Sequence, residues 1–398
     1  MNTRALFLLA LAGFTGGALS QTAVVIDDFK SPDTNAQGNY HGCDAGDGIT
    51  CTWGDGSLTI TSSDTDYSFY SQFTNGCQDV TSWESQYVHV KFSGSPNFSI
   101  ALQQNNPGCK AEVAPYPETW DIVYAADYSD GSDIYIPISH FNINKSRAVG
   151  LAFKAFRDAG VETKFSLIEI ATGLPGGRSV PEKKPTGPLY FACTRPNSIA
   201  FGIDDGVPEL ADRMMQIIDE AGIKVTFFTV GNALDDPSQP FTKLYQDAVK
   251  KGHQVALHSY THPKIEGLPT VSAIDDEFKK SRESTLRNLG VDSKYFRAPY
   301  GTDGALTRQR LLANVPGAKV INWSIDIQDW VFLENDPNNG QTAAAASDIA
   351  KGGNLFVAHY LYNTTVNQFK DFIALAKGTG KTIMRIDQCL EDPEAPPL

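Results

Sequence analysis

Five short stretches between residues 200 and 360 each place reactive side chains just after an apolar run. Together they hold adjacent aspartates, two histidines four residues apart, an arginine, another histidine and further carboxylates. Histidine and carboxylate groups can hold a divalent cation, and the groups left over can move protons. The set predicts metal-assisted hydrolysis of an acyl group. The stretches are Ile203–Gly206, His258–His262, Arg297–Tyr300, Asp326–Trp330 and Val357–His359.

The elements that must position these residues alternate between strand and helix patterns from Leu189 onward. This alternation predicts a parallel barrel or a doubly wound sheet. Barrel enzymes carry their chemistry at the carboxyl ends of the strands, where the reactive residues fall here. Helices are expected at Pro208–Ala221, Thr242–Lys251 and Ser272–Leu289, each followed directly by glycine. Strands are expected at Ser198–Ile203, Lys224–Val230, Gln254–His258, Tyr295–Ala298, Lys319–Ile325, Leu355–His359 and Thr382–Ile386.

The N-terminal part, residues 21–172, has short apolar runs separated by Gly, Asn, Asp and Ser turns, without a convincing helix. This pattern predicts an all-β sandwich, jelly-roll-like, that could serve as a carbohydrate-binding accessory domain. Residues 173–188 are rich in Gly, Pro, Lys and Arg and are expected to be a linker. Strands are expected at Tyr87–Phe92, Phe98–Leu102, Asp133–Ile138, Val149–Phe156 and Lys164–Ile170. Four aromatic residues could stack on sugars or belong to the core: Tyr40, Trp53, Trp83 and Trp120.

Four of the reactive stretches carry a specific resemblance. Residues 202–207 read Gly-Ile-Asp-Asp-Gly-Val, and residues 258–263 read His-Ser-Tyr-Thr-His-Pro. Arg-Ala-Pro-Tyr at 297–300 and Asp-Ile-Gln-Asp-Trp at 326–330 follow in order. These motifs resemble the polysaccharide deacetylase (NodB-homology) domain of carbohydrate esterase family four, over roughly residues 189–390. The resemblance implies a distorted (β/α)7 barrel of NodB type as the catalytic domain, residues 189–398.

The resemblance also implies a metal site. Asp205, His258 and His262 would be the ligands, leaving positions open for water and substrate, as in catalytic sites. Zinc is the first choice, and Co²⁺ or another divalent ion is compatible with the same ligands. Asp204 would be the general base, unless it only caps the following helix. Adjacent aspartates on a straight strand face opposite ways, so a turn at Gly206 is needed to bring both into one site.

The other implied roles concern proton transfer and the walls of the site. His359 would be the general acid and Asp329 would orient it. Arg297 would pair with Asp204, and the backbone N–H of Tyr300 would help to hold the oxyanion. Trp330 and Val357 would line the pocket for the acetyl methyl group. For His359 and Trp330 a purely structural place in the core is the alternative, and His253 is assigned to structure.

The chain departs from the family motifs at four places. Gly202, Ile203 and Val207 stand where the family usually has Thr, Phe and Pro, and Val357 stands where it has Leu. None of these changes removes a ligand or a proton carrier. They bear on substrate preference rather than on the reaction.

The first twenty residues read as a secretory signal, with Arg4, an apolar run and a small-residue cleavage site before Gln21. Six cysteines follow the signal, and their positions favour the pairs Cys43–Cys51, Cys77–Cys109 and Cys193–Cys389. Glycosylation sequons, which need surface exposure, begin at Asn97, Asn144, Asn322 and Asn363. No hydrophobic tail for a lipid anchor is evident. We therefore expect a secreted, extracellular glycoprotein.

The net charge of −13 argues against nucleic acid as a partner. It is compatible with a cationic glycan and equally with a well-solvated secreted protein that has no charged partner. We expect a monomeric, metal-dependent enzyme that removes N-acetyl groups from N-acetylglucosamine polymers or oligomers, chitin or chitosan, and releases acetate. The alternatives are an acetylxylan O-acetyl esterase of the same family and an inactive carbohydrate-binding protein. The intact set of reactive residues argues against the inactive protein.

Overall fold

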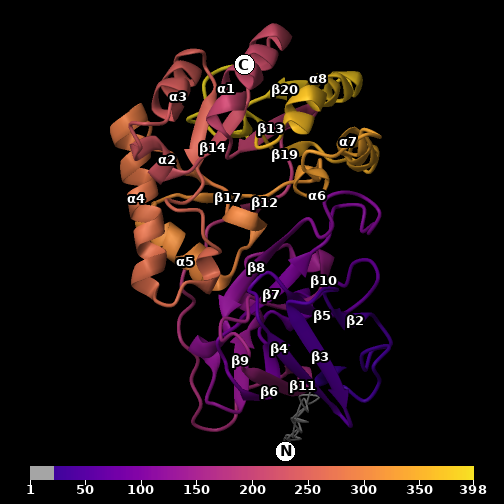
Figure 1. The fold of residues 1–398 in the computed structure, drawn as a ribbon. Coiled ribbons are helices and arrows are strands. Elements are labelled where there is room, and N and C mark those ends of the chain that lie inside the picture. Colours follow the sequence, from indigo (N-terminus) through magenta and orange to yellow (C-terminus); the bar gives the residue numbers. More distant parts are fainter. Residues whose placement is uncertain (1–21) are drawn as a thin grey trace, which may run out of the picture.

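The structure is a computed structural model that describes residues 22–398. The secretory signal expected at residues 1–20 lies outside the described residues. Within residues 22–398 no helix is long and apolar enough to cross a membrane. The chain forms a β-sandwich followed by a parallel sheet with outer helices, and the two parts lie one above the other (Figure 1).

The N-terminal part consists of two antiparallel sheets. The six-stranded sheet has the order β3-β4-β11-β6-β9, with β1 beside β11, and the five-stranded sheet has the order β2-β5-β10-β7-β8. The first sheet comprises β1 (Val24–Asp27), β3 (Ile49–Gly54), β4 (Ser57–Ser62), β6 (Tyr87–Gly94), β9 (Asp133–Pro137) and β11 (Glu162–Ala171). The second comprises β2 (His41–Cys43), β5 (Ser68–Gln72), β7 (Ser99–Gln104), β8 (Thr119–Tyr124) and β10 (Ala148–Lys154).

Alternation of side chains builds the core of this sandwich. Along β11, Thr163 and Phe165 are buried whereas Glu162 and Lys164 face solvent. The inward residues of both sheets form one apolar cluster, in which Phe153 and Phe165 pack edge to face at 5.2 Å. The five strands expected in this part all form.

The C-terminal part is built on a nine-stranded sheet whose pairs are parallel. Its order is β12-β17-β16-β15-β14-β13-β19-β18, with β20 beside β13. The strands are β12 (Leu189–Tyr190), β13 (Ser198–Asp204), β14 (Thr226–Thr229), β15 (Gln254–Leu257), β16 (Tyr295–Phe296), β17 (Lys319–Ile321), β18 (Ile325–Asp326), β19 (Leu355–His359) and β20 (Thr382–Met384). The sheet curls into a half-barrel, so the expected α/β architecture after an antiparallel sandwich is confirmed.

Helices cover the outside of this sheet (Figure 1). Helix α1 begins with Pro208 at its first turn and ends at Gly222, which adopts φ 66°. Thr270 caps α4 by accepting from the Ala273 N–H. The three expected helices therefore form. The helices are α1 (Pro208–Ala221), α2 (Gly231–Asp235), α3 (Phe241–Lys250), α4 (Val271–Leu289), α5 (Ala305–Asn314), α6 (Asp329–Phe332), α7 (Gly340–Ala350), α8 (Asn363–Gly378) and α9 (Ile386–Cys389).

The single strand expected over Lys319–Ile325 is wrong. The run breaks at residues 322–324 into β17, which lies second in the strand order beside β12, and β18, which lies at the other end. The break is possible because Arg297 donates to the carbonyl oxygens of Ile321 and Asn322 and so satisfies groups that a continuous ladder would pair. The parallel sheet is consequently open where a seven-stranded barrel would close.

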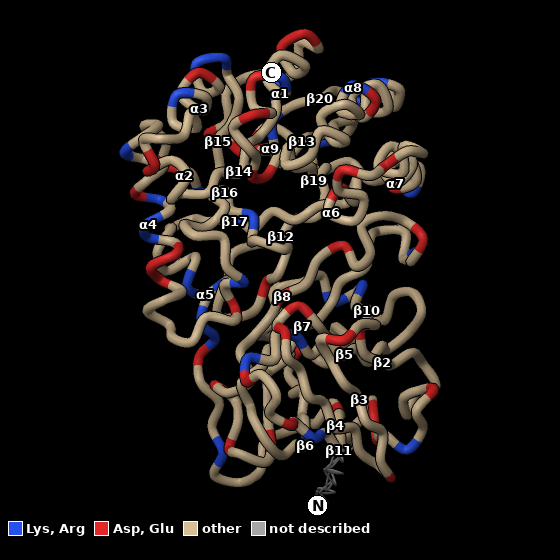
Figure 2. Tube along the Cα trace, in the orientation of Figure 1, with Lys and Arg blue, Asp and Glu red and all other residues tan. Residues whose placement is uncertain are grey.

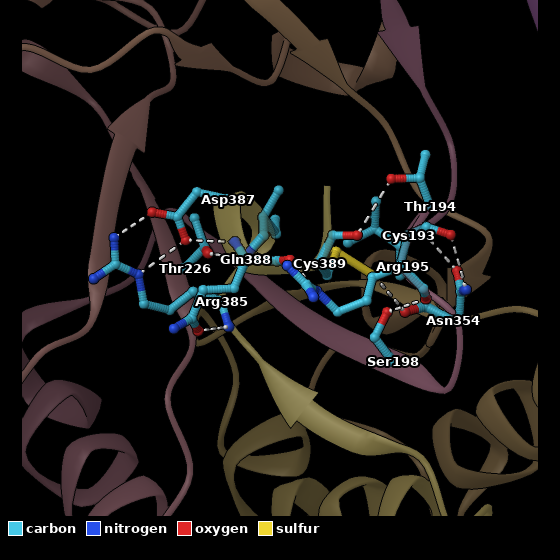
Figure 3. Close-up of a disulfide and its surroundings, with 12 residues drawn as sticks. Cys193, Thr194, Arg195, Ser198, Thr226, Asn354, Arg385, Asp387, Gln388 and Cys389 are labelled. Carbon is cyan, nitrogen blue, oxygen red and sulfur yellow. Dashed lines mark hydrogen bonds and ion pairs between the residues drawn. A yellow bond between two sulfur atoms is a disulfide. The ribbon is translucent and has the colours of Figure 1, made fainter. Parts of the chain in front are cut away.

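Three disulfides join the cysteine pairs that their positions favoured: Cys43–Cys51, Cys77–Cys109 and Cys193–Cys389. The last links the segment before β13 to α9 across 196 residues. Figure 3 shows Asn354 beside this disulfide, where its side-chain oxygen accepts a hydrogen bond from the Cys193 backbone N–H. The disulfide ties the two ends of the parallel domain together, which restricts the unfolded chain more than the native one.

One of the four sequons lacks the surface exposure that a glycosylation site needs. Asn322 is only 5% exposed in the barrel seam, so it does not meet the requirement for exposure. Asn97 is half-buried and its side-chain amide donates to Asp158. Asn144 and Asn363 are exposed and stay candidates.

The sandwich and the parallel domain are held together by direct bonds. Trp120 Nε1 of β8 donates to Asp303 at 3.1 Å, and Arg308 of α5 donates to the Trp120 carbonyl at 3.0 Å. Residues 172–188, all described, contain neither helix nor strand, and Lys183 there pairs with Asp121 of the sandwich. Acidic and basic residues are interspersed over both parts (Figure 2).

Candidate active site

The reactive residues meet at the carboxyl ends of neighbouring parallel strands. Asp204 ends β13 and lies in register with His359 at the end of β19. His258 follows β15 directly, and Arg297 follows β16. Parallel pairing fixes these ends at one edge of the sheet. The resulting pocket has a volume of about 460 Å³.

A tight turn after β13 brings both aspartates to the same side. Asp205 adopts φ 46° and Gly206 φ 151°, a region that favours glycine. A Cβ on Gly206 would lie 1.9 Å from the ring of buried Tyr360, so no other residue fits. Gly206 thus permits the turn that two adjacent carboxylates need in order to face one pocket, and Tyr360 packs against it.

Three side chains converge beside this turn in a way that suits a metal ion. The ligand atoms of Asp205, His258 and His262 all lie within 4.8 Å of one another, and within residues 22–398 this is the one such group of His, Cys and carboxylate residues found. His262 Nε2 is 3.0 Å from Asp205 Oδ2. His258 Nδ1 donates to the Arg297 carbonyl at 2.8 Å, which leaves Nε2 unprotonated toward the site.

The Asp205 carboxylate provides the test of fit. Its Oδ1 is buried and has no hydrogen-bond partner among the described residues. Burial opposes ionisation, but His258 and His262 outweigh it and lower the pKa of Asp205 to about 2. A buried, ionised oxygen without a donor is costly unless a cation completes it. The donor set therefore fits a divalent cation.

Asp204 is held by a buried arginine. Arg297 Nη1 donates to Asp204 Oδ1 at 2.7 Å, with Arg297 fully buried and Asp204 2% exposed. A Cβ on Gly202 would lie 2.5 Å from the guanidinium. The glycine that departs from the family motif therefore makes room for Arg297. Asp204 keeps its second oxygen on the pocket side, 4.0 Å from His258 Nε2.

His359 and Asp329 form the second histidine–carboxylate pair. His359 Nδ1 donates to Asp329 Oδ1 at 2.9 Å, and the His359 backbone N–H donates to Oδ2 at 2.7 Å. Burial lowers the pKa of His359, but the Asp329 charge outweighs it and raises the pKa to about 9. The imidazole is thus oriented and kept protonated, with Nε2 available to a substrate.

Comparison with known proteins agrees with this geometry. Residues 192–314 match the sequence model of the family described as Polysaccharide deacetylase. A chitin deacetylase of Pestalotiopsis sp is 28% identical over 217 residues, 53% of this chain and 70% of that protein. One of Colletotrichum lindemuthianum is 26% identical over 218 residues, 52% of this chain and 85% of that protein. Residues 192–314 thus mark a polysaccharide deacetylase domain in the C-terminal half of the chain.

Two further similarities cover a comparable part of the chain. A probable peptidoglycan-N-acetylglucosamine deacetylase of Arthroderma benhamiae is 27% identical over 53% of this chain, but the match spans only 48% of that protein. The solved structure of the Colletotrichum lindemuthianum chitin deacetylase aligns with a TM-score of 0.46 and 23% identity, over 53% of this chain and 94% of that one.

Three further predicted residues line the pocket, and one predicted to be structural lies away from it. Trp330 and Val357 both line the pocket; Trp330 is 63% exposed at its mouth and Val357 is buried. Tyr300 has φ 61° and ψ 8°, and its ring lies edge-on to His262 at 5.0 Å. His253 lies apart from the pocket: its Nδ1 accepts from the Val225 N–H, and burial lowers its pKa to about 4.

One residue that lines the pocket comes from the sandwich and was missed. Asp66, in the loop between β4 and β5, lines the deacetylase pocket. Its carboxylate pairs with Lys264 and accepts from Thr302, and burial raises its pKa. Lys264 also lies 5.3 Å from the ring of Tyr300. No motif in the sequence connects Asp66 with a histidine site 200 residues later.

Proposed function

We propose that this protein is a secreted, metal-dependent deacetylase that removes N-acetyl groups from N-acetylglucosamine polymers or oligomers, chitin or chitosan, with release of acetate. The buried Asp205 Oδ1, which has no hydrogen-bond partner within residues 22–398, carries the proposal. It lies beside two histidines and calls for a cation next to two separate proton-transfer groups. The chitin deacetylase relatives support the substrate class. In this proposal residues 189–398 are the catalytic domain, residues 21–172 an accessory sandwich and residues 173–188 their connection.

The chain's own residues divide the reaction between them. Asp205, His258 and His262 would hold the cation, with Zn²⁺ as the first candidate; when bound it polarises an acyl oxygen and lowers the pKa of water. Asp204, which accepts a hydrogen bond from Arg297, takes the proton from the attacking water. The Tyr300 backbone N–H donates to the developing oxyanion.

His359 completes the reaction. Its Nε2–H protonates the departing amine, and Asp329 stabilises the positive ring until that proton is given up. Trp330 and Val357 enclose the acetyl methyl group in an apolar wall. The apolar wall limits the size of the acyl group that can enter the pocket. The reaction itself requires only the metal ligands and the proton-transfer groups.

The test is acetate release by the purified full chain. N-acetylglucosamine oligomers, chitosan and acetylated xylan are compared with added Zn²⁺ and after chelation, with Asp204→Asn as the inactive control. Chelator-sensitive release from the amino-sugar substrates is expected. Release mainly from acetylated xylan would replace the proposal with an O-acetyl esterase. If no substrate released acetate while the protein still retained a metal ion, the deacetylase proposal would fail.

A further inference from the structure

A second hollow adjoins the active site on the side of the sandwich. It has a volume of about 540 Å³, within the range of ligand sites, and it lies between the five-stranded sheet and the deacetylase domain. Trp323 and Asp326 line both this hollow and the active-site pocket. The two spaces therefore border each other at these residues. We call the hollow the interdomain groove.

Aromatic side chains from both parts face this groove. Tyr40, Tyr70 and Tyr116 come from the sandwich, and Trp323 comes from the segment between β17 and β18. Tyr40 is 48% exposed, although tyrosine rings are usually more covered. Flat aromatic faces bury the apolar faces of sugar rings while leaving the hydroxyl groups free to bond at the edges. Three tyrosines opposite a tryptophan suit a chain of sugar rings.

The charged groups of the groove are mainly acidic. Asp44, Asp326 and Asp348 line it, and Asp348 is paired with Lys351 at 3.2 Å, whereas Lys154 is the one cation among its lining residues. Lys154 is directed over the ring of Trp120, 4.8 Å from its centre. Carboxylates at the wall of a partly enclosed site attract cationic ligands and repel anionic ones. The groove therefore favours sugars that carry a free amine.

The two walls are held in fixed relation, so the groove exists before a ligand arrives. The Ala114 N–H donates to the Lys351 carbonyl at 3.0 Å. Ala114 lies two residues before Tyr116 of one wall, and Lys351 lies three residues after Asp348 of the other. Thr119 Oγ1 donates to the Leu189 carbonyl at 2.8 Å. A preformed groove loses less entropy on binding than one assembled by the ligand.

We infer that the interdomain groove binds glucosamine-containing units of the same glycan chain that enters the active site, flanking the unit that is deacetylated. The inference rests on the proposed function, since it assumes an amino-sugar polymer as substrate. It gives the sandwich a direct part in substrate recognition: the sandwich builds one wall of the site.

The experiment measures kcat/KM for acetate release by the full chain on N-acetylglucosamine oligomers of two to six units. For the wild type, kcat/KM is expected to rise with length. Tyr40→Ala, and Tyr40→Ala combined with Tyr116→Ala, should lower kcat/KM on the hexamer about fivefold or more, as loss of aromatic contacts predicts, and leave the dimer within about twofold. Tyr87→Ala, on β6 of the other sheet, is the matched control and should change neither.

Calorimetry with a glucosamine hexamer supplies a readout that needs no turnover. The wild type should bind this hexamer more tightly than the N-acetylated one, with an affinity that falls as salt rises, and Tyr40→Ala should weaken binding about fivefold. If no substrate releases acetate, the proposed function fails and the calorimetry alone decides about the groove. Wild-type affinity in both tyrosine variants, or equal affinity for the two hexamers, would overturn the inference.

Discussion

Arg297 donates to Asp204 at 2.7 Å in a place from which solvent is excluded, and the same guanidinium reaches three carbonyl oxygens of the barrel. Two of these belong to Ile321 and Asn322 at the end of β17, and the third belongs to Phe356 on β19. Arg297 thus bridges the two sides of the open seam while it neutralises Asp204. The electrostatics of the site and the link between the two sides of the seam therefore depend on one side chain.

Arg297→Gln should therefore cost stability as well as activity. Removing one partner of a buried ion pair leaves an uncompensated charge, and we expect the free energy of unfolding to fall by about 3–5 kcal/mol. Urea denaturation measures the change. Arg310→Gln, which breaks the more exposed pair with Asp275, is the control and should cost about 0–1 kcal/mol. Equal small losses for the two variants would contradict the role given to Arg297.

Asp204→Asn and Asp205→Ala should separate the base from the ligand. Asparagine keeps the shape of Asp204 and an oxygen for Arg297, so metal content should persist while acetate release falls by about 10²–10⁴-fold. Asp205→Ala should lose both, because it removes a ligand. Metal analysis of the purified variants and an acetate assay give the two readouts. Near-normal rates for Asp204→Asn would show that another group is the base.

The His359–Asp329 pair predicts a descending limb in the pH profile. Asp329 raises the pKa of His359 to about 9, so the ring is protonated below that pH and loses its proton as the pH rises through it. The general acid is then absent, and kcat should fall above about pH 9. Asp329→Asn removes the charge that raises the pKa, so the limb should move toward the ordinary histidine value of about 6.5. A limb that stays in place in Asp329→Asn would mean that another group titrates.

The strand-end residues could be predicted from the sequence because of simple geometry. Asp204, His258, Arg297 and His359 each follow an apolar run, and parallel strands bring such ends to one edge. The seam could not be predicted in this way, since Val320 and Ile325 are equally apolar and the pattern does not show the break between them. The place of Asp66 in the pocket could not be predicted either, because Asp66 and Lys264 lie far apart in the sequence and meet only where the sandwich contacts the deacetylase domain.

The docking interface itself predicts that the sandwich and the deacetylase domain stabilise each other. Ala305 at the start of α5 is fully buried against Ala101, Ile122 and Ala152 of the five-stranded sheet. Its backbone N–H donates to Ser99 Oγ at 3.0 Å, which fixes the start of α5 against this sheet.

Ala305→Glu in the full chain should bury an unpaired charge at this interface and lower the free energy of unfolding by about 3 kcal/mol or more. Ala343→Glu, on an exposed face of α7, is the matched control and should change it by no more than about 0.5 kcal/mol. Thermal unfolding followed by circular dichroism compares the two. Because the sandwich forms a wall of the active site through Asp66, Ala305→Glu should also reduce acetate release at temperatures where the wild type is stable. If the two variants unfolded at the same temperature and worked equally well, the interface would be no more than a contact between independent domains.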